Sequence, residues 1–474
     1  MRERNNIKHS DTTLQIITML ESLAEILLLA FIYYRIWRAS YPAGLFPPLE
    51  HRGRFVLMGL YVLVLLIILA ATKGLRFGYL KTADVVITQW VGICLTNLIT
   101  YFQLSLIANG LVKIKPIIVL TLISFVVALI CCIFFNYVYM ALVKKKHLIM
   151  VYGNENALYL KFKTNTQLKK YKVDRTLSIN EDYETIYAAL HEYDGVIIND
   201  VPGNRRNHVL KYCYEHGIEV YLVPKITDIF VRGADDITML DTPIICISGK
   251  GLSFGQRFAK RALDLVLVLL ALIPCLPIML VTAIAIKLDD HGPIFYIQNR
   301  VTRGGKLFKV YKFRSMIVDA DKKGLRPMVD GDPRLTRVGR IIRRARIDEL
   351  PQLFNILLGS MSMVGPRPEH VRHVRKYSKE IPEFKFREKV KGGLTGYAQI
   401  YGKYNTTAYD KLRLDLIYIE NYSFLLDLKL IMQTVRVLFE PESTAGFNKL
   451  EDMEAWKEAE LNSEDSTYLE RVDD

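Results

Sequence analysis

Residues 265–286 read LVLVLLALIPCLPIMLVTAIAI, a run of 22 residues without a charged side chain. At ~1.5 Å per residue, such a helix is long enough to cross the ~30 Å hydrocarbon layer of a bilayer. Pro274 and Pro277 stand near its middle, where proline removes a backbone donor and clashes with the preceding turn. The sequence therefore predicts a membrane helix that kinks or breaks near residues 273–276.

Two topologies fit this segment. A plain kinked transmembrane helix would carry the residues that follow it to the opposite face of the membrane. Lys260 and Arg261 precede the run and Lys287 follows it, and basic residues at both ends favour two ends on the cytoplasmic face. We therefore expect a re-entrant helix at about residues 263–287, which enters, breaks and leaves on one side.

Four more apolar stretches lie upstream and reach or approach the roughly 20 residues that a spanning helix needs. They cover residues 14–37, 55–72, 85–111 and 117–143. Three lysines at 144–146 follow the fourth stretch and favour a cytoplasmic C-terminal half. Glu21 and Glu25 lie four residues apart in the first stretch, where they form either an interhelical or interfacial contact or a functional site.

The pattern changes from His147 to about Ile247. Short β-branched runs (LIMVYG, GVIIND, GIEVYLVP) alternate with polar helical segments, which predicts a parallel α/β sheet. The first strand ends at Gly153, but Asn154 and Glu155 follow where a dinucleotide fingerprint needs glycines. We therefore interpret residues 147–248 as a Rossmann-like module for sensing or packing, without an NAD site.

The 474-residue chain combines 51% hydrophobic residues with a net charge of +14. Residues 291–350 carry 15 Lys and Arg against six acids, and residues 335–345 place arginines and apolar side chains on different helix faces. Between these arginines there are no aromatic or polar side chains suited to contact nucleic-acid bases, so no nucleic acid is expected. Anionic lipid or phosphate is the favoured partner. Six cysteines without CxxC or Cys/His spacing indicate reduced thiols and no zinc.

Asp348 and Glu349 stand at the end of this basic segment. Because Pro351 follows two residues after Glu349, the pair could cap the first turn of a helix. Two adjacent carboxylates beside guanidiniums also suit Mg²⁺-dependent phosphoryl transfer, in which one carboxylate attacks phosphorus and the other holds the metal. The charge pattern alone leaves both interpretations open.

Two downstream turns have a composition that suits anions. Arg367 lies between Pro366 and Pro368, whose fixed φ angles suit the presentation of a guanidinium fork to a phosphate. The glycines of GGLTGYAQ (392–399) predict a tight turn whose backbone amides could face an anion. Such glycine turns are common, so this second signal is weak by itself.

Seven strings in the C-terminal half occur in a fixed order. They are KRALDLVLVLLALIPCLPIM, GPIFYIQNRV, FKVYKFRSM, DPRLTRVGRIIRRARIDELPQLFNIL, GSMSMVGPRPE, GLTGYAQI and LDLIYIENYSFLLDLKLI. Over residues 260–439 this set resembles the bacterial sugar transferase family, the polyprenyl-phosphate hexose-1-phosphate transferases that begin the assembly of capsule, exopolysaccharide and O-antigen. The upstream spans and the glycine-poor module resemble the large membrane form of this family in layout.

The resemblance implies transfer of a sugar 1-phosphate from a UDP-sugar to undecaprenyl phosphate on the cytoplasmic face, with release of UMP. By this resemblance Asp348 is the nucleophile, which forms an aspartyl-phosphosugar intermediate, and Glu349 binds Mg²⁺. Lys312, Arg343 and Arg367 match family positions tied to phosphate or substrate. We add Arg314 as a phosphate-binding candidate on charge alone.

The resemblance also implies an architecture. The pair Pro274 and Pro277 is similar to the break in the family's re-entrant helix, whose halves stay on one face of the inner membrane. We therefore expect a multi-domain membrane protein with a mainly α catalytic domain. The expected divisions are a four-helix transmembrane bundle (1–146), the Rossmann-like α/β domain (147–248), the catalytic domain (249–439) and an acidic C-terminal tail (440–474).

Two departures from the family concern the donor. Gly392 stands where the family commonly has Pro, and Tyr401-Gly402-Lys403 replaces Asn-Gly-Arg. Both fall in the turn expected near the nucleotide or sugar, so the sequence does not name the sugar; glucose and galactose are favoured by resemblance. A homo-oligomer, the ligand of the α/β module and the role of the tail are left open.

Two rival functions compete with the covalent route. In one, the lipid phosphate attacks directly in a ternary complex, with Asp348 serving as base or ligand. In the other, the chain is a catalytically silent membrane scaffold or nucleotide-sugar sensor for polysaccharide synthesis. The intact Asp348-Glu349 pair, together with Arg343 and Arg367, argues against the silent scaffold.

Overall fold

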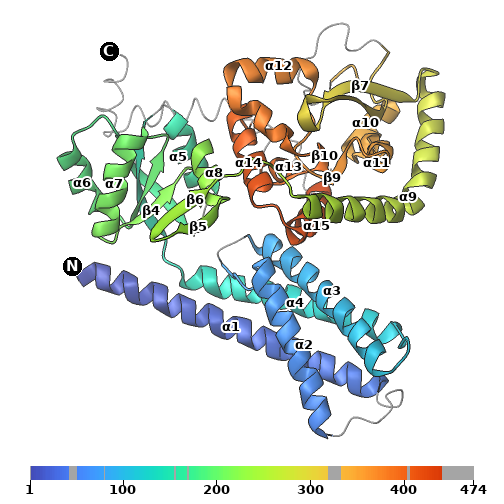
Figure 1. Cartoon of the computed structure of the whole chain (residues 1–474), viewed down its shortest axis with the longest axis horizontal. Coiled ribbons are helices and arrows are strands. Elements are labelled where there is room, and N and C mark those ends of the chain that lie inside the picture. Colours follow the sequence, from blue (N-terminus) through green and yellow to red (C-terminus); the bar gives the residue numbers. More distant parts are fainter. Residues whose placement is uncertain are drawn as a thin grey trace. The chain divides into compact units, whose positions relative to one another are not determined.

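The computed structural model describes residues 2–41, 51–78, 81–153, 156–167, 170–318, 332–402 and 406–439. The acidic tail at 440–474, Lys403, and the residues Asn154 and Glu155 of the altered fingerprint lie outside the described residues. The chain divides into two units, Met1–Tyr221 and Leu222–Asp474, which are described separately (Figure 1).

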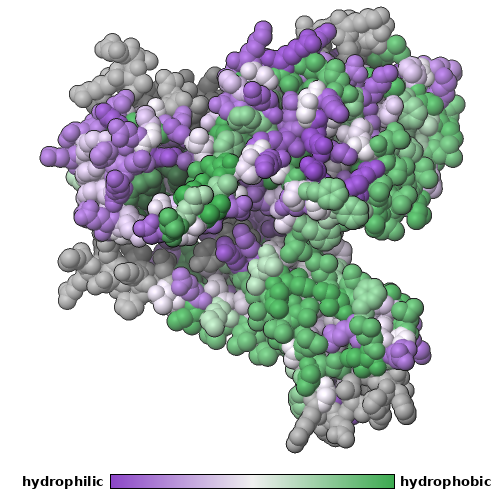
Figure 2. Space-filling view, viewed as in Figure 1, coloured by the Kyte–Doolittle hydropathy of each residue, from purple (hydrophilic) through white to green (hydrophobic). Residues whose placement is uncertain are grey.

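The first unit begins with four long apolar helices. They are α1 (Arg2–Ser40), α2 (His51–Thr72), α3 (Thr82–Ile107) and α4 (Lys115–Leu142). All four contain stretches long and apolar enough to cross a membrane, as the sequence predicts, although the third ends at Ile107 rather than at Leu111. Figure 2 shows hydrophobic residues gathered over these helices, as lipid contact requires. This is a membrane protein.

Polar side chains join these helices inside the bundle. Nε2 of Gln89 in α3 donates to Oε2 of Glu25 in α1 over 2.8 Å, and both side chains are buried. The hydroxyl of Tyr61 in α2 donates to Oδ1 of Asn97 in α3 over 3.2 Å. Glu25 is therefore an interhelical contact, one of the two interpretations that the sequence leaves open.

An α/β sheet follows in the same unit, as the alternation of short apolar runs predicts. Its strands lie in the order β2-β1-β3-β4, and β1 pairs in parallel with both β2 and β3. The elements are β1 (Lys146–Tyr152), α5 (Asn156–Gln167), β2 (Tyr171–Ser178), α6 (Tyr183–Leu190), β3 (Gly195–Asn199), α7 (Gly203–Glu215) and β4 (Glu219–Leu222). β3 is buried along its whole length, as befits an inner strand of a parallel sheet.

One segment of this region departs from the predicted parallel sheet. Strands β5 (Asp235–Met239) and β6 (Thr242–Cys246) form an antiparallel hairpin that belongs to the second unit. Only two residues separate the strands, and such a short connection can join only antiparallel neighbours. Leu240 adopts φ 58 in this turn.

The rest of the second unit is mainly helical, and the label η marks its 3-10 helices. Its elements are α8 (Ile226–Arg232), α9 (Phe254–Asp290), β7 (Phe295–Val301), η2 (Arg303–Gly305), β8 (Leu307–Phe313), α10 (Arg337–Arg344), η4 (Ile347–Glu349), α11 (Gln352–Leu357), β9 (Ser362–Val364), α12 (Val371–Glu380), η5 (Pro382–Lys389), β10 (Gly393–Thr395), α13 (Tyr397–Tyr401), α14 (Ala408–Glu420) and α15 (Phe424–Phe439). The small sheets are the antiparallel pair β7-β8 and the parallel pair β9-β10.

Helix α9 contains the proline-bearing apolar run. The sequence predicts a kink or break near residues 273–276; the helix continues from Phe254 to Asp290 through Pro274 and Pro277, and Figure 1 shows it as two arms that meet at a bend. A kink therefore replaces a full break, because each proline removes only one backbone donor.

The two sides of α9 have different partners. Val268 and Leu272 pack with Val310 and Leu353, and further along the helix Met279 and Ile286 pack with Phe313. The opposite side exposes apolar side chains that include Leu269, Leu270, Ile273, Leu280, Val281 and Leu288. An exposed apolar stripe of this length is a surface for lipid.

The first arm of α9 is anchored by a buried charge. Nζ of Lys260 donates to Oδ2 of Asp427 over 2.6 Å and to the hydroxyl of Tyr418 over 2.9 Å. The Tyr418 hydroxyl in turn donates to Oδ1 of Asp427 over 2.8 Å. All three side chains are buried, so this network ties α9 to α14 and α15.

Breaking one half of this network should destabilise the second unit strongly. We expect Asp427→Asn to lower the free energy of unfolding by about 3–5 kcal/mol, because it leaves the Lys260 ammonium buried without a counter-charge. Lys376→Met, which removes the exposed pair Lys376–Glu380, should cost no more than about 0.5 kcal/mol. Thermal unfolding of the detergent-solubilised protein compares them, and equal losses would contradict the anchor.

Candidate active site

The acidic pair lies in a tight turn between two helices. After α10, Arg346 adopts a left-handed conformation with φ 55 and ψ 20, which reverses the chain before η4 presents Asp348 and Glu349. Ile347 and Leu350 flank the pair and pack against the hydrophobic cluster that contains residues of α9 and β8. The acidic pair is therefore fixed directly beside the membrane helix.

Neither carboxylate caps the following helix. α11 begins after Pro351 with no side-chain cap, which removes the capping interpretation of the pair. The Asp348 side chain is buried, and among the described residues it makes no hydrogen bond or ion pair. A buried carboxylate without a partner is costly, so stability does not explain the burial of Asp348.

Glu349 is held on both sides. Nζ of Lys312, from β8, donates to its Oε1 over 2.9 Å, and Nη2 of Arg367, from the loop after β9, donates to the same oxygen over 2.8 Å. Burial alone would raise the pKa of Glu349, but the charges of Arg367 and Lys312 outweigh it and hold this pKa well below its usual range. Glu349 is therefore an anchored anion.

Asp348 has the opposite electrostatic balance. Burial first, and the negative charge of Glu349 second, raise its pKa to about 6, against the opposing charges of Lys312 and Arg343. Two adjacent carboxylates with pKa values pushed apart can take different chemical roles. The structure thus brings together Asp348, Glu349, Lys312, Arg343 and Arg367.

Arg314 is not available to this cluster. Its two Nη atoms donate to the carboxylate of Asp290, and its Nε donates to the carbonyl of Pro293 over 2.6 Å. These bonds occupy both edges of the guanidinium and fasten the end of α9 to β8. The sequence offers no signal for this, since a basic residue two positions after Lys312 fits a phosphate role equally well.

The chain has relatives among known proteins. The family model described as "Bacterial sugar transferase" matches residues 255–441. The "UDP-N-acetylgalactosamine-undecaprenyl-phosphate N-acetylgalactosaminephosphotransferase" of Aeromonas hydrophila is 32% identical over 326 residues, 66% of this chain and 72% of that protein. The chain belongs to the bacterial sugar transferase family. It is a transferase.

Two other relatives match shorter parts of this sugar transferase. The "UDP-glucose:undecaprenyl-phosphate glucose-1-phosphate transferase" of Escherichia coli (strain K12) is 38% identical over 221 residues, 46% of this chain and 48% of that protein. The "Exopolysaccharide production protein PSS" of Rhizobium leguminosarum bv. phaseoli is 42% identical over 186 residues, 37% of this chain and 92% of that protein.

The glycines of this sugar transferase serve close packing. A Cβ on Gly365 would lie 2.4 Å from the carbonyl oxygen of Lys391, and one on Gly393 would lie 2.1 Å from the amide nitrogen of Gly365. The amide of Gly393 donates to the carbonyl of Pro366 over 3.0 Å, and that of Gly392 donates to Oγ1 of Thr302 over 3.2 Å. Because the protein itself uses these amides, they do not form the anion turn that the sequence suggests.

Two residues that sequence reasoning missed support the cluster. Asn355 accepts from the amide of Tyr311 over 3.0 Å and donates to the carbonyl of Lys309 over 2.7 Å, which fixes α11 along β8. Arg300 lies beside Arg367, and burial followed by the charge of Arg367 lowers its pKa to about 10. The sequence carries a signal for each residue. Asn355 is a polar residue inside an apolar run, and Arg300 is one of the polar side chains at every second position of β7.

The donor set fits a Mg²⁺ ion that is shared with substrate. Among the residues that the structure describes, no three His, Cys, Asp or Glu side chains form a metal cluster. Mg²⁺ commonly needs only one or two carboxylates together with phosphate oxygens and water. Both cations bind Oε1 of Glu349, so its second oxygen is the carboxylate group that would hold a metal at this site.

The different placements of Arg314 and Arg343 can be tested by one pair of variants. We expect Arg314→Gln to lower the free energy of unfolding by about 2 kcal/mol, because Asp290 loses its charged partner. Arg343→Gln should change it by less than about 0.5 kcal/mol but lower transferase turnover at least roughly tenfold, because a cation near Asp348 is lost. Thermal unfolding and initial rates measure both; the reverse pattern would contradict the placement.

Proposed function

We propose that the protein transfers a sugar 1-phosphate from a UDP-sugar to undecaprenyl phosphate at the cytoplasmic face of the inner membrane and releases UMP, as the first step of capsule, exopolysaccharide or O-antigen assembly. The observation that carries the proposal is the buried carboxylate of Asp348, which makes no hydrogen bond or ion pair with any described residue, beside the anchored Glu349. The names of the relatives support the substrate class.

The first step attaches the sugar phosphate to the protein. An oxygen of Asp348 attacks the phosphorus that bears the sugar, the bond from that phosphorus to the bridging oxygen breaks, and UMP leaves with the electron pair. The resulting aspartyl-phosphosugar keeps the sugar 1-phosphate at the membrane surface. The charges of Lys312, Arg343 and Arg367 all act on Asp348 and would stabilise the charge on the transferring phosphoryl oxygens.

The second step regenerates the carboxylate. A phosphate oxygen of undecaprenyl phosphate attacks the same phosphorus, and the Asp348 carboxylate leaves with the electron pair. One phosphoanhydride is consumed and one is formed, so the overall exchange is nearly balanced in energy. The location of Asp348 beside α9 supports this step, because a lipid phosphate approaches from the membrane surface.

Mg²⁺ would contribute charge neutralisation on the diphosphate of the donor. Glu349 would hold it, since this carboxylate is already ionised and fixed by Lys312 and Arg367. Asp348, which has no such anchor among the described residues, would be the nucleophile.

The relatives suggest several donor sugars rather than a single one. Glucose and N-acetylgalactosamine occur in their names, and galactose is favoured by resemblance. The departures at Gly392 and residues 401–403 fall where the donor is expected to bind. UDP-glucose, UDP-galactose and UDP-N-acetylgalactosamine are therefore the donors to compare.

We expect the covalent route to leave the sugar phosphate attached to the protein when no lipid is present. With Mg²⁺ and a UDP-sugar labelled with ³²P on the phosphate next to the sugar, but without lipid, the protein should become labelled and release an equal amount of UMP. Asp348→Asn should lose both signals, because an amide is a poor nucleophile, and chelation of Mg²⁺ should suppress them in the wild type.

Adding undecaprenyl phosphate provides the control, since it should move the label from the protein to the lipid. Unlabelled protein that nevertheless forms labelled lipid would instead indicate direct attack in a ternary complex. Absence of UMP release with all three donors would favour the scaffold or sensor.

The re-entrant course of α9 is part of the same proposal. Lys260 near its start and Asp290 at its end both bind residues of the second unit, which supports two ends on one face. The hydrophobic stripe between them supports insertion into the membrane.

We expect cysteines placed before and after the apolar run of α9 to be labelled from the same side. In a background without the six native cysteines, Gly255→Cys and Lys306→Cys should both react with an impermeant maleimide in inside-out vesicles and neither in right-side-out vesicles. Both residues are exposed, so each cysteine can react. Labelling from opposite sides would show a spanning helix.

A further inference from the structure

The loop that carries Arg367 has few backbone N–H groups with which to hold its conformation. Pro366 and Pro368 have no backbone N–H, so this turn must be fixed mainly through its carbonyl oxygens. The carbonyl of Pro366 accepts from the amide of Gly393 over 3.0 Å, and the carbonyl of Pro368 accepts from the guanidinium of Arg300. Between them, the carbonyl of Arg367 accepts from Nη2 of Arg387 over 2.8 Å.

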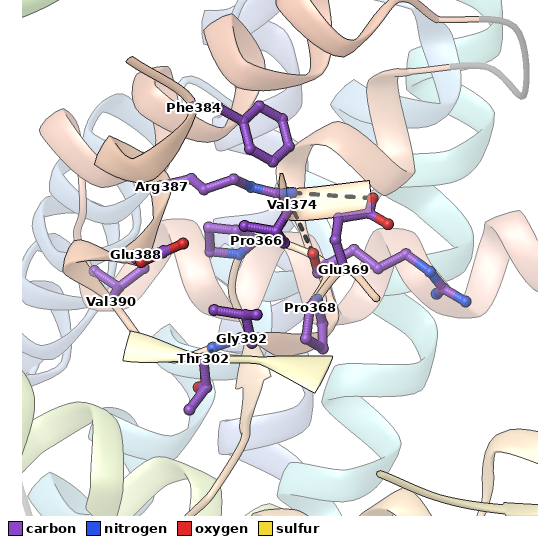
Figure 3. Close-up of a pocket in the computed structure, with 12 residues that line it drawn as sticks. Thr302, Pro366, Pro368, Glu369, Val374, Phe384, Arg387, Glu388, Val390 and Gly392 are labelled. Atoms are coloured by element: carbon purple, nitrogen blue, oxygen red, sulfur yellow. Dashed lines mark hydrogen bonds and ion pairs between the residues drawn. The ribbon is translucent and has the colours of Figure 1, made fainter. Parts of the chain in front are cut away.

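Arg387 is a buried cation between two carboxylates. Its side chain is 7% exposed, and Nη2 lies 2.7 Å from Oδ2 of Asp415 in an ion pair without the angle of a hydrogen bond. Nη1 lies 3.9 Å from Oε1 of Glu369, and Phe384 packs with its ring centroid 4.9 Å from the guanidinium carbon. Figure 3 shows Arg387 extended from η5 toward Glu369 under the Phe384 ring.

Asp415 connects this arginine to a rigid helix. It is 1% exposed on α14, one helical turn or less from Leu412 and Leu416, which are both fully buried in the core of the second unit. A buried ion pair is a poor way to gain stability, because desolvation offsets most of its attraction. Burying charge at this point therefore makes sense chiefly as a means of orientation.

The contacts form one continuous path to the acidic pair. Asp415 on α14 faces the Arg387 guanidinium, which binds the backbone of Arg367, whose own side chain binds Glu349. We propose that Arg387, oriented by Asp415, is a positioning residue that sets the Arg367 guanidinium for transfer of the phosphoryl group. This inference rests on the proposed function and adds to it two residues that touch neither substrate nor the reacting atoms.

The proposal predicts which kinetic parameter changes. A displacement of about 1 Å at a group that acts in the transition state can cost ~100-fold in rate. Because Arg387 acts through Arg367, its loss should lower kcat by about 10- to 100-fold and change KM for the UDP-sugar by less than about threefold. Arg387→Lys, which keeps the charge between Asp415 and Glu369, should recover part of the loss that Arg387→Gln causes.

A double-mutant cycle separates positioning from a general structural effect. UMP release is measured for the full-length wild type, Arg387→Gln, Arg367→Ala and the double variant, with the donor that the wild type uses. If Arg387 acts through Arg367, then Arg387→Gln should add less than about twofold in the Arg367→Ala background. Equal fold losses in both backgrounds would overturn the proposal.

Two further variants test the proposal even if Arg387→Gln does not fold. Asp415→Asn preserves the shape of the side chain and removes the charge that orients Arg387, so it should lower kcat at least about fivefold. An unchanged kcat in this variant would overturn the proposal. Arg413→Lys, which alters another Arg–Asp pair of α14, should leave kcat within about twofold. A wild type that releases no UMP would instead contradict the proposed function.

Discussion

The ion pairs of Glu349 with Lys312 and Arg367 determine the arrangement of the site. They join three segments far apart in the sequence: strand β8, the turn after α10, and the loop after β9. A buried carboxylate is stable only when its charge and hydrogen bonds are satisfied, and Glu349 meets that condition with two cations on one oxygen. Among the described residues Asp348 has no such partner, and this contrast distinguishes the two acids.

Helix α9 connects this arrangement to the membrane. One stripe of the helix is apolar and exposed, and the other carries both apolar and polar contacts to the second unit. Asp264 accepts from Oγ of Ser362 over 3.0 Å and from the amide of Met363 over 2.8 Å, so the helix holds the strand that leads into the Arg367 loop. A change in the seating of α9 would therefore reach the acidic pair through a short series of hydrogen bonds.

The residues that sequence reasoning found and missed differ in a physical way. Asp348, Glu349, Lys312 and Arg367 stand in distinctive strings, and the structure brings them together. Arg314 stands in the same kind of string, but its guanidinium is engaged by Asp290 and Pro293. The alternatives could not be separated in advance, because a guanidinium binds a carboxylate, a carbonyl or a phosphate with the same fork of donors.

Local pattern is sufficient for the features that depend on neighbouring residues. The apolar helices, the alternating strands of the α/β region, the proline kink of α9 and the adjacency of two carboxylates all follow from spacing along the chain. The roles of Arg300, Asn355, Arg387 and Asp415 do not, because their partners lie tens of residues away or on other elements. Charge balance in a buried site depends on which groups share a low-dielectric volume, and three-dimensional packing alone sets that.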